Sequence, residues 1–315
     1  MSALPASSPT PPPAPPAGTL SERLCLAAAD IKLSHSVFAL PFAVLGAFLA
    51  RPADEAWSTS GIKLALVVAC MVLARTWAML VNRIADVRID AENPRTARRA
   101  VASGRLPAGQ AKAFAFACAA LFVGVCSVFW FLFANPWPVM LCVPVLGWLA
   151  LYSFAKRFTA ACHLLLGTAL AISPIAACLA VNPAHALHPA VLFIAGFVAL
   201  WVAGFDVLYA LQDEAFDRAK GLFSIPSWLG AKRAAWVSRA MHVGAASCLF
   251  MAWRCEPRFG AVFACAVGLA AVLLVMEHVV LVRRGLSGLP MAFFTLNGCV
   301  SVAIGTAGLI DVLLT

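Results

Sequence analysis

The fold is decided by two segments, LVNRIADVRIDAEN at residues 80–93 and GFDVLYALQDEAFDRAKG at residues 204–221, where acidic side chains interrupt an otherwise apolar chain. In the first segment Asn82, Asp86 and Asp90 recur at intervals of four residues. On an α-helix this spacing places the three side chains on one stripe that drifts by only about 40° per step. The first segment is therefore predicted to be a helix end that directs three polar groups at one ligand.

The second segment repeats this spacing with Asp213 and Asp217. Carboxylates crowded at the end of a membrane helix repel one another, which favours a shared hard cation such as magnesium. Magnesium prefers oxygen ligands and commonly joins one or two carboxylates to the phosphate oxygens of a substrate. Two such stripes predict a diphosphate clamped between metal ions, which makes the four aspartates the candidate catalytic residues.

Each stripe is expected to hold one Mg²⁺ ion, Asp86 with Asp90 on one side and Asp213 with Asp217 on the other. Asn82 lies one turn deeper in the membrane and can offer a neutral carbonyl oxygen to the first ion without adding charge.

Asp206 and Tyr209 lie further into the apolar part of the second segment. A charge at that depth costs about 2.5–3.5 kcal/mol on membrane-insertion scales, so Asp206 needs a partner or a proton. Tyr209 is three residues on, and both side chains can face one cavity. We expect them to contact an aromatic substrate or to stabilise a cation.

Basic residues near these segments are candidates for binding the diphosphate, because guanidinium groups match phosphate oxygens and stay protonated. Setting the membrane topology is the alternative role for each of them. The candidates are Arg83, Arg95, Arg98, Arg157 and Arg218.

The composition excludes an ordinary soluble domain, since 63% of the 315 residues are hydrophobic, only 12% are charged and the mean hydropathy is +0.90. Apolar stretches long enough to cross about 30 Å of hydrocarbon predict an all-α membrane protein with about nine transmembrane helices. The stretches are 28–50, 61–82, 110–133, 136–154, 160–181, 189–212, 233–253, 259–281 and 290–314.

Lysine and arginine accumulate in every second loop between these stretches, as they do on the cytoplasmic side of membrane proteins. We therefore expect a multi-pass protein of a bacterial inner or plasma membrane, with its N-terminus and both acidic segments in the cytoplasm. The formal charge of +9 fits this asymmetry together with a lipid bilayer and phosphate-bearing partners, and does not require nucleic acid.

The N-terminal residues 1–22 are rich in proline and alanine, without a basic start or an apolar core typical of a signal peptide. We predict a disordered tail there, followed by a single transmembrane domain over residues 23–315. The eleven cysteines form no CxxC pair and are interpreted as small packing residues.

The two acidic segments resemble the motifs NxxxDxxxD and DxxYAxxDxxxD of the UbiA superfamily of intramembrane prenyltransferases. The resemblance extends to KLSHSVFALPFA at 32–43, to NPRTARRAVASGRLP at 93–107, to YSFAKRFT at 152–159 and to GLFSIPSWLG at 221–230. It implies a helical bundle around a central cavity open to lipid, with the motifs facing each other on the cytoplasmic side. It also implies Mg²⁺-dependent transfer of a polyprenyl group from polyprenyl diphosphate to an electron-rich aromatic carbon.

The resemblance carries roles over to individual residues. Asn82 and the four aspartates match the metal and diphosphate set, while Lys156 and Arg157 match a position that contacts diphosphate. Typical 4-hydroxybenzoate enzymes have an Arg-Pro element in the first helix, and this chain has Lys32, Ser34 and His35 there instead. Lys32 is a candidate for contact with the carboxylate of an aromatic acceptor or with the diphosphate.

The amino-acid sequences of the motifs are most similar to those of the 4-hydroxybenzoate polyprenyltransferase branch, particularly its relatives in futalosine-route menaquinone synthesis. The expected acceptor is an aromatic carboxylate of the 4-hydroxybenzoate or 1,4-dihydroxy-6-naphthoate type, on the way to ubiquinone or menaquinone. Haem, homogentisate, chlorophyllide and glycerophosphate are alternative acceptors in similar proteins. A divalent-cation transporter is the alternative of another class, but its path needs polar groups at several depths, and our loop assignment leaves the opposite face without matching carboxylates.

Overall fold

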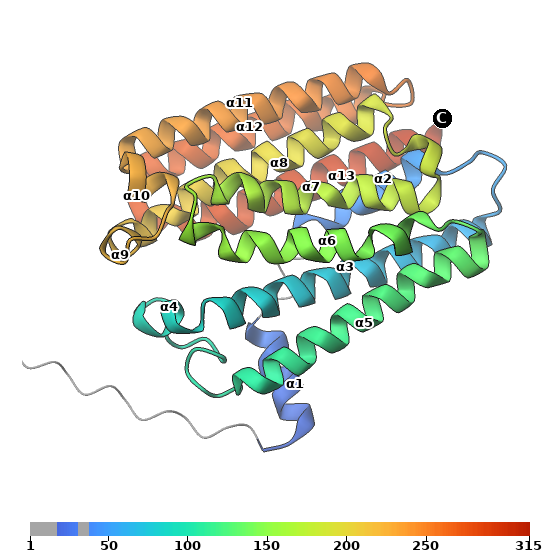
Figure 1. Cartoon of the computed structure of the whole chain (residues 1–315). Helices are drawn as coiled ribbons and strands as arrows, with labels where there is room; N and C mark the ends of the chain where they lie inside the picture. The colour runs from blue at the N-terminus through green and yellow to red at the C-terminus, as the bar shows by residue number, and fades with distance from the viewer. Residues whose placement is uncertain (1–17, 31–37) are drawn as a thin grey trace, which may run out of the picture.

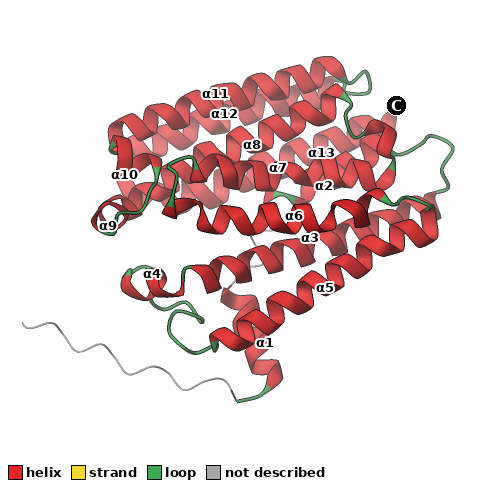
Figure 2. Ribbon diagram, in the orientation of Figure 1, coloured by secondary structure: helices red, strands yellow, loops and turns green. Residues whose placement is uncertain are grey.

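The structure, a computed structural model, describes residues 18–30 and 38–315. Within these residues the regular elements are all helical (Figures 1 and 2), which confirms the all-α prediction. The α-helices are α1 (Leu20–Asp30), α2 (Leu40–Ala50), α3 (Trp57–Ala85), α4 (Val87–Glu92), α5 (Ala108–Phe133), α6 (Trp137–Phe154), α7 (Cys162–Val181), α8 (Pro189–Tyr209), α9 (Glu214–Ala219), α10 (Ile225–Leu229), α11 (Ala231–Cys255), α12 (Ala261–Arg284) and α13 (Asn297–Leu314).

Seven helices of the described residues are long and apolar enough to cross a membrane, and the protein is an integral multi-pass membrane protein. They are α3, α5, α6, α7, α8, α12 and the helical segment Met291–Leu314, which begins as a π-helix and continues as α13. Two of the nine predicted stretches fall outside this set. Helix α11 is 25 residues long but carries Lys232, Arg233 and Arg239 in its first half, and α2 has only 11 residues.

The first predicted stretch, 28–50, is described in two parts. Helix α1 extends to Asp30, and the apolar helix α2 begins at Leu40. Residues 31–37, which include Lys32 and His35, lie outside the described residues. The short α2 packs against α7, where a Cβ on Gly46 would lie 2.4 Å from the carbonyl oxygen of Pro174. A small residue is therefore required at this crossing, as is common between membrane helices.

The N-terminal tail is predicted to reach residue 22, and residues 1–17 of it lie outside the described part. Helix α1 begins at Leu20 because Thr19 and Glu22 cap it reciprocally. The Glu22 N–H donates to the Thr19 hydroxyl at 3.3 Å, and the Thr19 N–H donates to the Glu22 carboxylate at 2.9 Å. This Thr-x-x-Glu capping box is a sequence signal for a helix start.

Helix α8 lies at the centre of the bundle, between α7 and α11 (Figure 1). A Cβ on Gly167 of α7 would lie 2.1 Å from the carbonyl oxygen of Ala199, so glycine lets these two helices approach closely. Trp201 of α8 is fully buried and stacks on Phe197 at a centroid distance of 5.4 Å. The central helix is thereby held rigidly, and its C-terminal end carries the second acidic motif.

Helices α3 and α8 both end at the same end of the bundle, where the short helices α4 and α9 continue the chain (Figure 1). An ion pair between Glu92 of α4 and Lys220, directly after α9, joins the two. The two acidic motifs, more than a hundred residues apart in sequence, are therefore brought to one end of the molecule.

Candidate active site

The first motif lies across the junction of α3 and α4. Asp86 separates the two helices, but the backbone N–H of Asp86 bonds the carbonyl of Asn82 at 2.9 Å, and that of Asp90 bonds the carbonyl of Asp86 at 2.7 Å. These i to i−4 bonds preserve helical spacing through the junction. Asn82, Asp86 and Asp90 therefore stay on one side, as the four-residue spacing predicted.

The second motif runs from the end of α8 into α9. Asp206 and Tyr209 belong to the last turns of α8, Asp213 ends a short 3-10 turn, and Asp217 lies on α9. The change of helix type tightens the chain between Tyr209 and Asp213. All four side chains still line one cavity.

That cavity has a volume of about 460 Å³ and lies between the two motifs. We call it the polar cavity. Its lining contains most of the site residues predicted from sequence, namely Asn82, Arg83, Asp86, Asp90, Lys156, Asp206, Tyr209, Asp213 and Asp217, together with Arg95 and Arg98. Arg157 reaches it through Asp86, Arg218 pairs with Glu214 on the outer side of α9, and Lys32 is not among the described residues.

Each carboxylate of the first motif faces a cation from another segment. Arg157, after α6, approaches Asp86 at 2.9 Å, and Arg99, in the loop after α4, approaches Asp90 at 2.7 Å. Burial raises the pKa of the Asp86 carboxyl, and the charge of Arg157 opposes that rise. The arginine therefore favours the ionised carboxylate that a metal ion requires.

The second motif is paired in the same way. Arg95 makes a bidentate contact with Asp213, at 2.5 and 2.9 Å, and the Asn93 amide donates to the same carboxylate at 3.1 Å. The ammonium of Lys156 lies 4.0 Å from Oδ2 of Asp217. Arg95 belongs to the loop that follows the first motif, so this pair links the two motifs directly.

The site fits metal ions that need substrate oxygens to complete their ligands. Among the described residues, no group of three or more His, Cys, Asp or Glu side chains could hold a metal ion by itself. Oδ2 of Asp217 is buried without a hydrogen-bond partner, so one carboxylate oxygen of the cavity is left for a ligand. Magnesium bound through one or two carboxylates and phosphate oxygens matches this donor set.

Asn82 is predicted to offer its amide oxygen to a metal ion, and in this structure that oxygen faces Arg83. Its Oδ1 accepts a hydrogen bond from Arg83 at 2.8 Å, and its Nδ2 donates to Asp86 at 3.2 Å. Arg83 is buried, and its guanidinium is directed at Asn82 and at Asp30 of α1. In this arrangement Asn82 supports Asp86 as a donor, and Arg83 contacts the protein.

Asp206 has the partner that its depth in the membrane demanded. His163 of α7 is fully buried, and its Nδ1 lies 2.7 Å from the Asp206 carboxylate. The backbone N–H of Ile225 donates to Nε2 of the same ring at 3.3 Å. Because Nε2 accepts, Nδ1 carries the hydrogen and donates this hydrogen bond to the carboxyl group of Asp206.

Some residues of the site have no local sequence signal. Phe293 packs its ring 4.2 Å from that of Tyr209, although 84 positions separate them in sequence. Arg95 contacts the Tyr209 hydroxyl at 3.4 Å. Arg99 could have been found, because it lies four residues after Arg95 in the RTARR stretch next to the first motif.

A second cavity of about 270 Å³ adjoins the polar cavity and shares Met79, Tyr152 and Leu166 with it. We call it the apolar cavity, and it is bounded mainly by α3, α5, α6 and α7. Along α3 its lining runs from Met79 back to Val67, about 18 Å at the rise of an α-helix.

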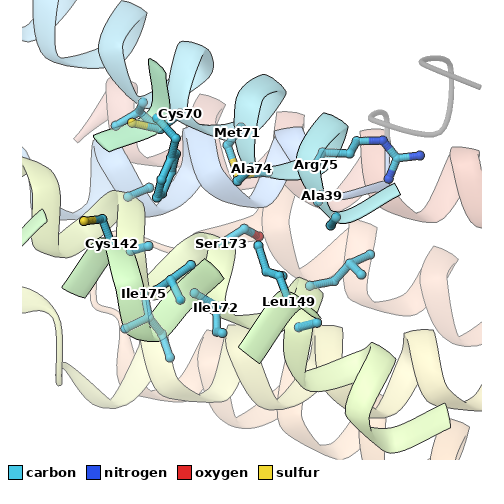
Figure 3. Close-up of a pocket in the computed structure, with 18 of the residues that line it drawn as sticks. Ala39, Cys70, Met71, Ala74, Arg75, Cys142, Leu149, Ile172, Ser173 and Ile175 are labelled. Atoms are coloured by element: carbon cyan, nitrogen blue, oxygen red, sulfur yellow. The ribbon is translucent and has the colours of Figure 1, made fainter. Parts of the chain in front are cut away.

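Figure 3 shows Arg75 and Ala39 near one end of the apolar cavity, and Cys70 and Cys142 near the other. Arg75 is the one charged residue in the described lining, and none of the described residues forms an ion pair or hydrogen bond with it. It precedes Asn82 by seven residues, which places it about two turns deeper on the same side of α3. Its signal in the sequence is an arginine inside an apolar stretch, which is by itself an indication of function.

Residues 39–298, well over half of the chain, match the model of one protein family. The protein belongs to the UbiA prenyltransferase family. In sequence it is 31% identical over 162 residues to a 4-hydroxybenzoate octaprenyltransferase of Francisella tularensis subsp. mediasiatica, covering 51% of this chain and 55% of that protein. It is also 31% identical over 153 residues to the enzyme of the same description from Hydrogenovibrio crunogenus, covering 49% and 51%. The chain therefore aligns with about half the length of these curated relatives.

Solved structures share the fold over nearly the whole chain. The apo structure of a UbiA homolog from Aeropyrum pernix superposes with a TM-score of 0.77 and 29% identity, covering 89% of this chain and 98% of that one. A UbiA homolog from Archaeoglobus fulgidus bound to DMAPP and Mg²⁺ gives a TM-score of 0.66 at 16% identity, covering 93% and 99%. These similarities establish the UbiA fold for the all-helical membrane bundle described above.

Proposed function

We propose that this prenyltransferase moves a polyprenyl group from a polyprenyl diphosphate to an aromatic quinone precursor, of the 4-hydroxybenzoate or 1,4-dihydroxy-6-naphthoate type, in a Mg²⁺-dependent reaction. The observation that carries the proposal is the junction of a polar cavity, lined by both acidic motifs, with an apolar cavity about 18 Å long. A polyprenyl diphosphate has the same two parts, a charged head and an apolar tail. Binding of DMAPP and of Mg²⁺ by the Archaeoglobus fulgidus homolog supports this choice of donor and metal.

The head of the donor belongs in the polar cavity. Mg²⁺ bound there would be held by Asp86 and Asp90 on one side and by Asp213 and Asp217 on the other, and it supplies charge stabilisation for the leaving diphosphate. Four cations already face these carboxylates, namely Arg95, Arg99, Lys156 and Arg157. Their donors can turn to the diphosphate oxygens once the carboxylates bind metal, since arginine binds phosphate as readily as carboxylate.

The tail of the donor belongs in the apolar cavity. Its lining is almost free of polar groups, so it keeps water away from the allylic carbon after the bond to the diphosphate oxygen breaks. The rings of Tyr209 and Phe293 line the polar cavity, and their faces can stabilise the allylic cation.

The acceptor is bound where the two cavities meet. Arg75, without a partner among the described residues, can bind a carboxylate there, which favours an aromatic acid over the acceptors without a carboxylate. A new bond forms between the allylic carbon and the ring, and the ring then loses a proton. Asp206 is the candidate acceptor of that proton, because it lines the cavity and His163 holds its side chain in place.

Acidic side chains at the opposite end of the bundle give no support to a transporter. The Glu55 carboxylate is paired with Lys63 at 2.5 Å, and Glu256 with Arg258 at 2.8 Å. Asp311 accepts from the backbone N–H groups of Gly260 and Phe263 at the start of α12. All three carboxylates are engaged in the structure of that end. We place the polar cavity on the cytoplasmic side of a bacterial membrane, because the arginine-rich loop 93–107 lies beside it.

The proposal is tested by prenyl transfer with the purified protein, Mg²⁺ and one polyprenyl diphosphate, offering 4-hydroxybenzoate and 1,4-dihydroxy-6-naphthoate side by side. Mass spectrometry of the products identifies the acceptor. We expect one prenylated aromatic acid. If neither forms, while homogentisate or a glycerophosphate is prenylated, the acceptor assignment is wrong and the prenyltransferase reaction stands.

A further inference from the structure

Asp30, the last residue of α1, lies outside both acidic motifs and yet contacts the machinery around them. Its Oδ1 accepts the backbone N–H of Ala100 at 2.9 Å, and its Oδ2 lies 3.6 Å from Nε of Arg83. Its backbone carbonyl accepts from Nη2 of the same arginine at 3.4 Å. The side chains of both ion-pair partners are less than 10% exposed, so solvent screens this pair little.

The contact of Asp30 with Arg83 is connected to the first motif by hydrogen bonds. Arg83 donates to Oδ1 of Asn82 at 2.8 Å, and Asn82 donates from Nδ2 to Asp86 at 3.2 Å. The orientation of the amide follows from chemistry, because a guanidinium can only donate and a carboxylate can only accept. Asn82 is thereby fixed as a hydrogen-bond donor to Asp86.

The contact of Asp30 with Ala100 holds a loop that contacts both motifs. Ala100 lies in the loop between α4 and α5, next to Arg99, which pairs with Asp90. The same loop carries Arg95, which pairs with Asp213. One carboxylate on α1 therefore holds the loop whose two arginines face one aspartate from each motif.

We propose that Asp30 is a positioning residue of the active site, and that it acts through Arg83 to keep Asn82 as a donor to Asp86. The inference rests on the proposed function, since its readout is Mg²⁺-dependent transfer. Two physical effects support it. Without Asp30 the buried charge of Arg83 has no anion of its own and competes with the metal for Asp86. The Asn82 amide also loses the arginine that fixes its orientation.

The first test is the Mg²⁺ dependence of Asp30→Asn. This variant keeps an oxygen for the Ala100 N–H and removes only the charge facing Arg83. We expect the half-saturating Mg²⁺ concentration to rise about tenfold, as for the loss of one charge-assisted interaction, while the KM for the acceptor is unchanged. Glu22→Gln is the matched control, because it removes the same charge from an exposed position of the same helix. It is expected to match the wild type.

A double-mutant cycle asks whether Asp30 acts through Arg83. In an Arg83→Gln background, Asp30→Asn is expected to change the half-saturating Mg²⁺ concentration less than twofold, since contacting residues are not additive. An equal tenfold change in both backgrounds would overturn the proposal. If wild type and Glu22→Gln both fail to transfer a prenyl group with any acceptor, the proposed function itself has failed.

Asn82→Asp tests the donor role of Asn82 and does not depend on how well the Asp30 variants fold. Aspartate keeps an oxygen that binds magnesium well but has no N–H for Asp86. We expect transfer to fall by at least about tenfold, with a higher requirement for Mg²⁺. Activity equal to that of the wild type would show that Asn82 serves as a metal ligand and would overturn the proposal.

Discussion

The polar and the apolar cavity of this protein are built by opposite means. In the polar cavity each of the four candidate metal-binding aspartates faces a lysine or arginine from outside its own motif. These aspartates are Asp86, Asp90, Asp213 and Asp217. In the apolar cavity Arg75 is the one charged side chain of the described lining. Under the proposed function, we expect the polar cavity to govern departure of the diphosphate, a group common to all prenyl donors. We expect the apolar cavity to govern which prenyl tail is accepted.

Removing magnesium is expected to have the largest effect on activity. It tests whether the polar cavity depends on a metal ion. Chelation should abolish transfer, because the charge that develops on the leaving diphosphate is then not stabilised by a metal ion. It should leave the melting temperature nearly unchanged, since the motif carboxylates already have cation partners in the protein. Turnover and thermal unfolding in detergent, each with and without chelator, measure both. Full activity in chelator would contradict a metal-dependent polar cavity.

Removing one motif carboxylate comes next. Asp86→Ala or Asp213→Ala should lower turnover by at least about a hundredfold, comparable to the loss of a principal electrostatic group in other enzymes. Membrane insertion and extraction should be unaffected. Glu214→Ala is the control, because Glu214 is adjacent to Asp213 but pairs with Arg218 on the surface of α9. Substantial activity of either aspartate variant would remove that residue from the metal set.

Variants of Arg75 test whether the aromatic acceptor is bound where the two cavities meet. Arg75→Gln should raise the KM for an aromatic acid about tenfold, as for the loss of one charged hydrogen bond, with little change in kcat at saturating acceptor. Arg75→Lys keeps the charge and should retain most of the affinity. A rise in the KM for the diphosphate in place of the acceptor would reassign Arg75 to the donor.

The smallest effect is expected from narrowing the apolar cavity. Ala74 of α3 lines it (Figure 3), and Ala74→Leu should lower transfer from long donors relative to short ones. The ratio of transfer from long donors to transfer from short donors should fall roughly fourfold for each methylene that is displaced from the cavity. Val143→Leu, on the exposed face of α6, is the matched control. Competition between two donors of different length, read by product mass, measures the ratio, and an equal ratio in both variants would place the tail elsewhere.

The sequence predicted the polar cavity far better than the apolar one, for a physical reason. A spacing of four residues determines which side chains share a helix face, so Asn82, Asp86 and Asp90 could be grouped from their positions in the chain alone. The hydropathy pattern likewise predicted the long helices. The hydropathy pattern shows that a helix face is apolar, but it does not specify which other apolar face packs against it. The lining of the apolar cavity could not be predicted for that reason.

Contacts between distant segments were the other part that sequence could not supply. Asp30 lies 53 residues from Arg83 and 70 from Ala100. Phe293 reaches Tyr209 only because the helical segment that begins at Met291 packs beside α8.

The assignment of head and tail to two adjoining cavities is tested most directly by photolabelling. A polyprenyl diphosphate analogue with a photoreactive group at the end of its tail is bound with Mg²⁺, irradiated, and the labelled peptides are mapped by mass spectrometry. We expect labels on α3, α6 and α7 near Cys70, Cys142 and Ile175, and their loss in Asp213→Ala. Labels on the exposed faces of α11 and α12 that persist in Asp213→Ala would contradict this assignment.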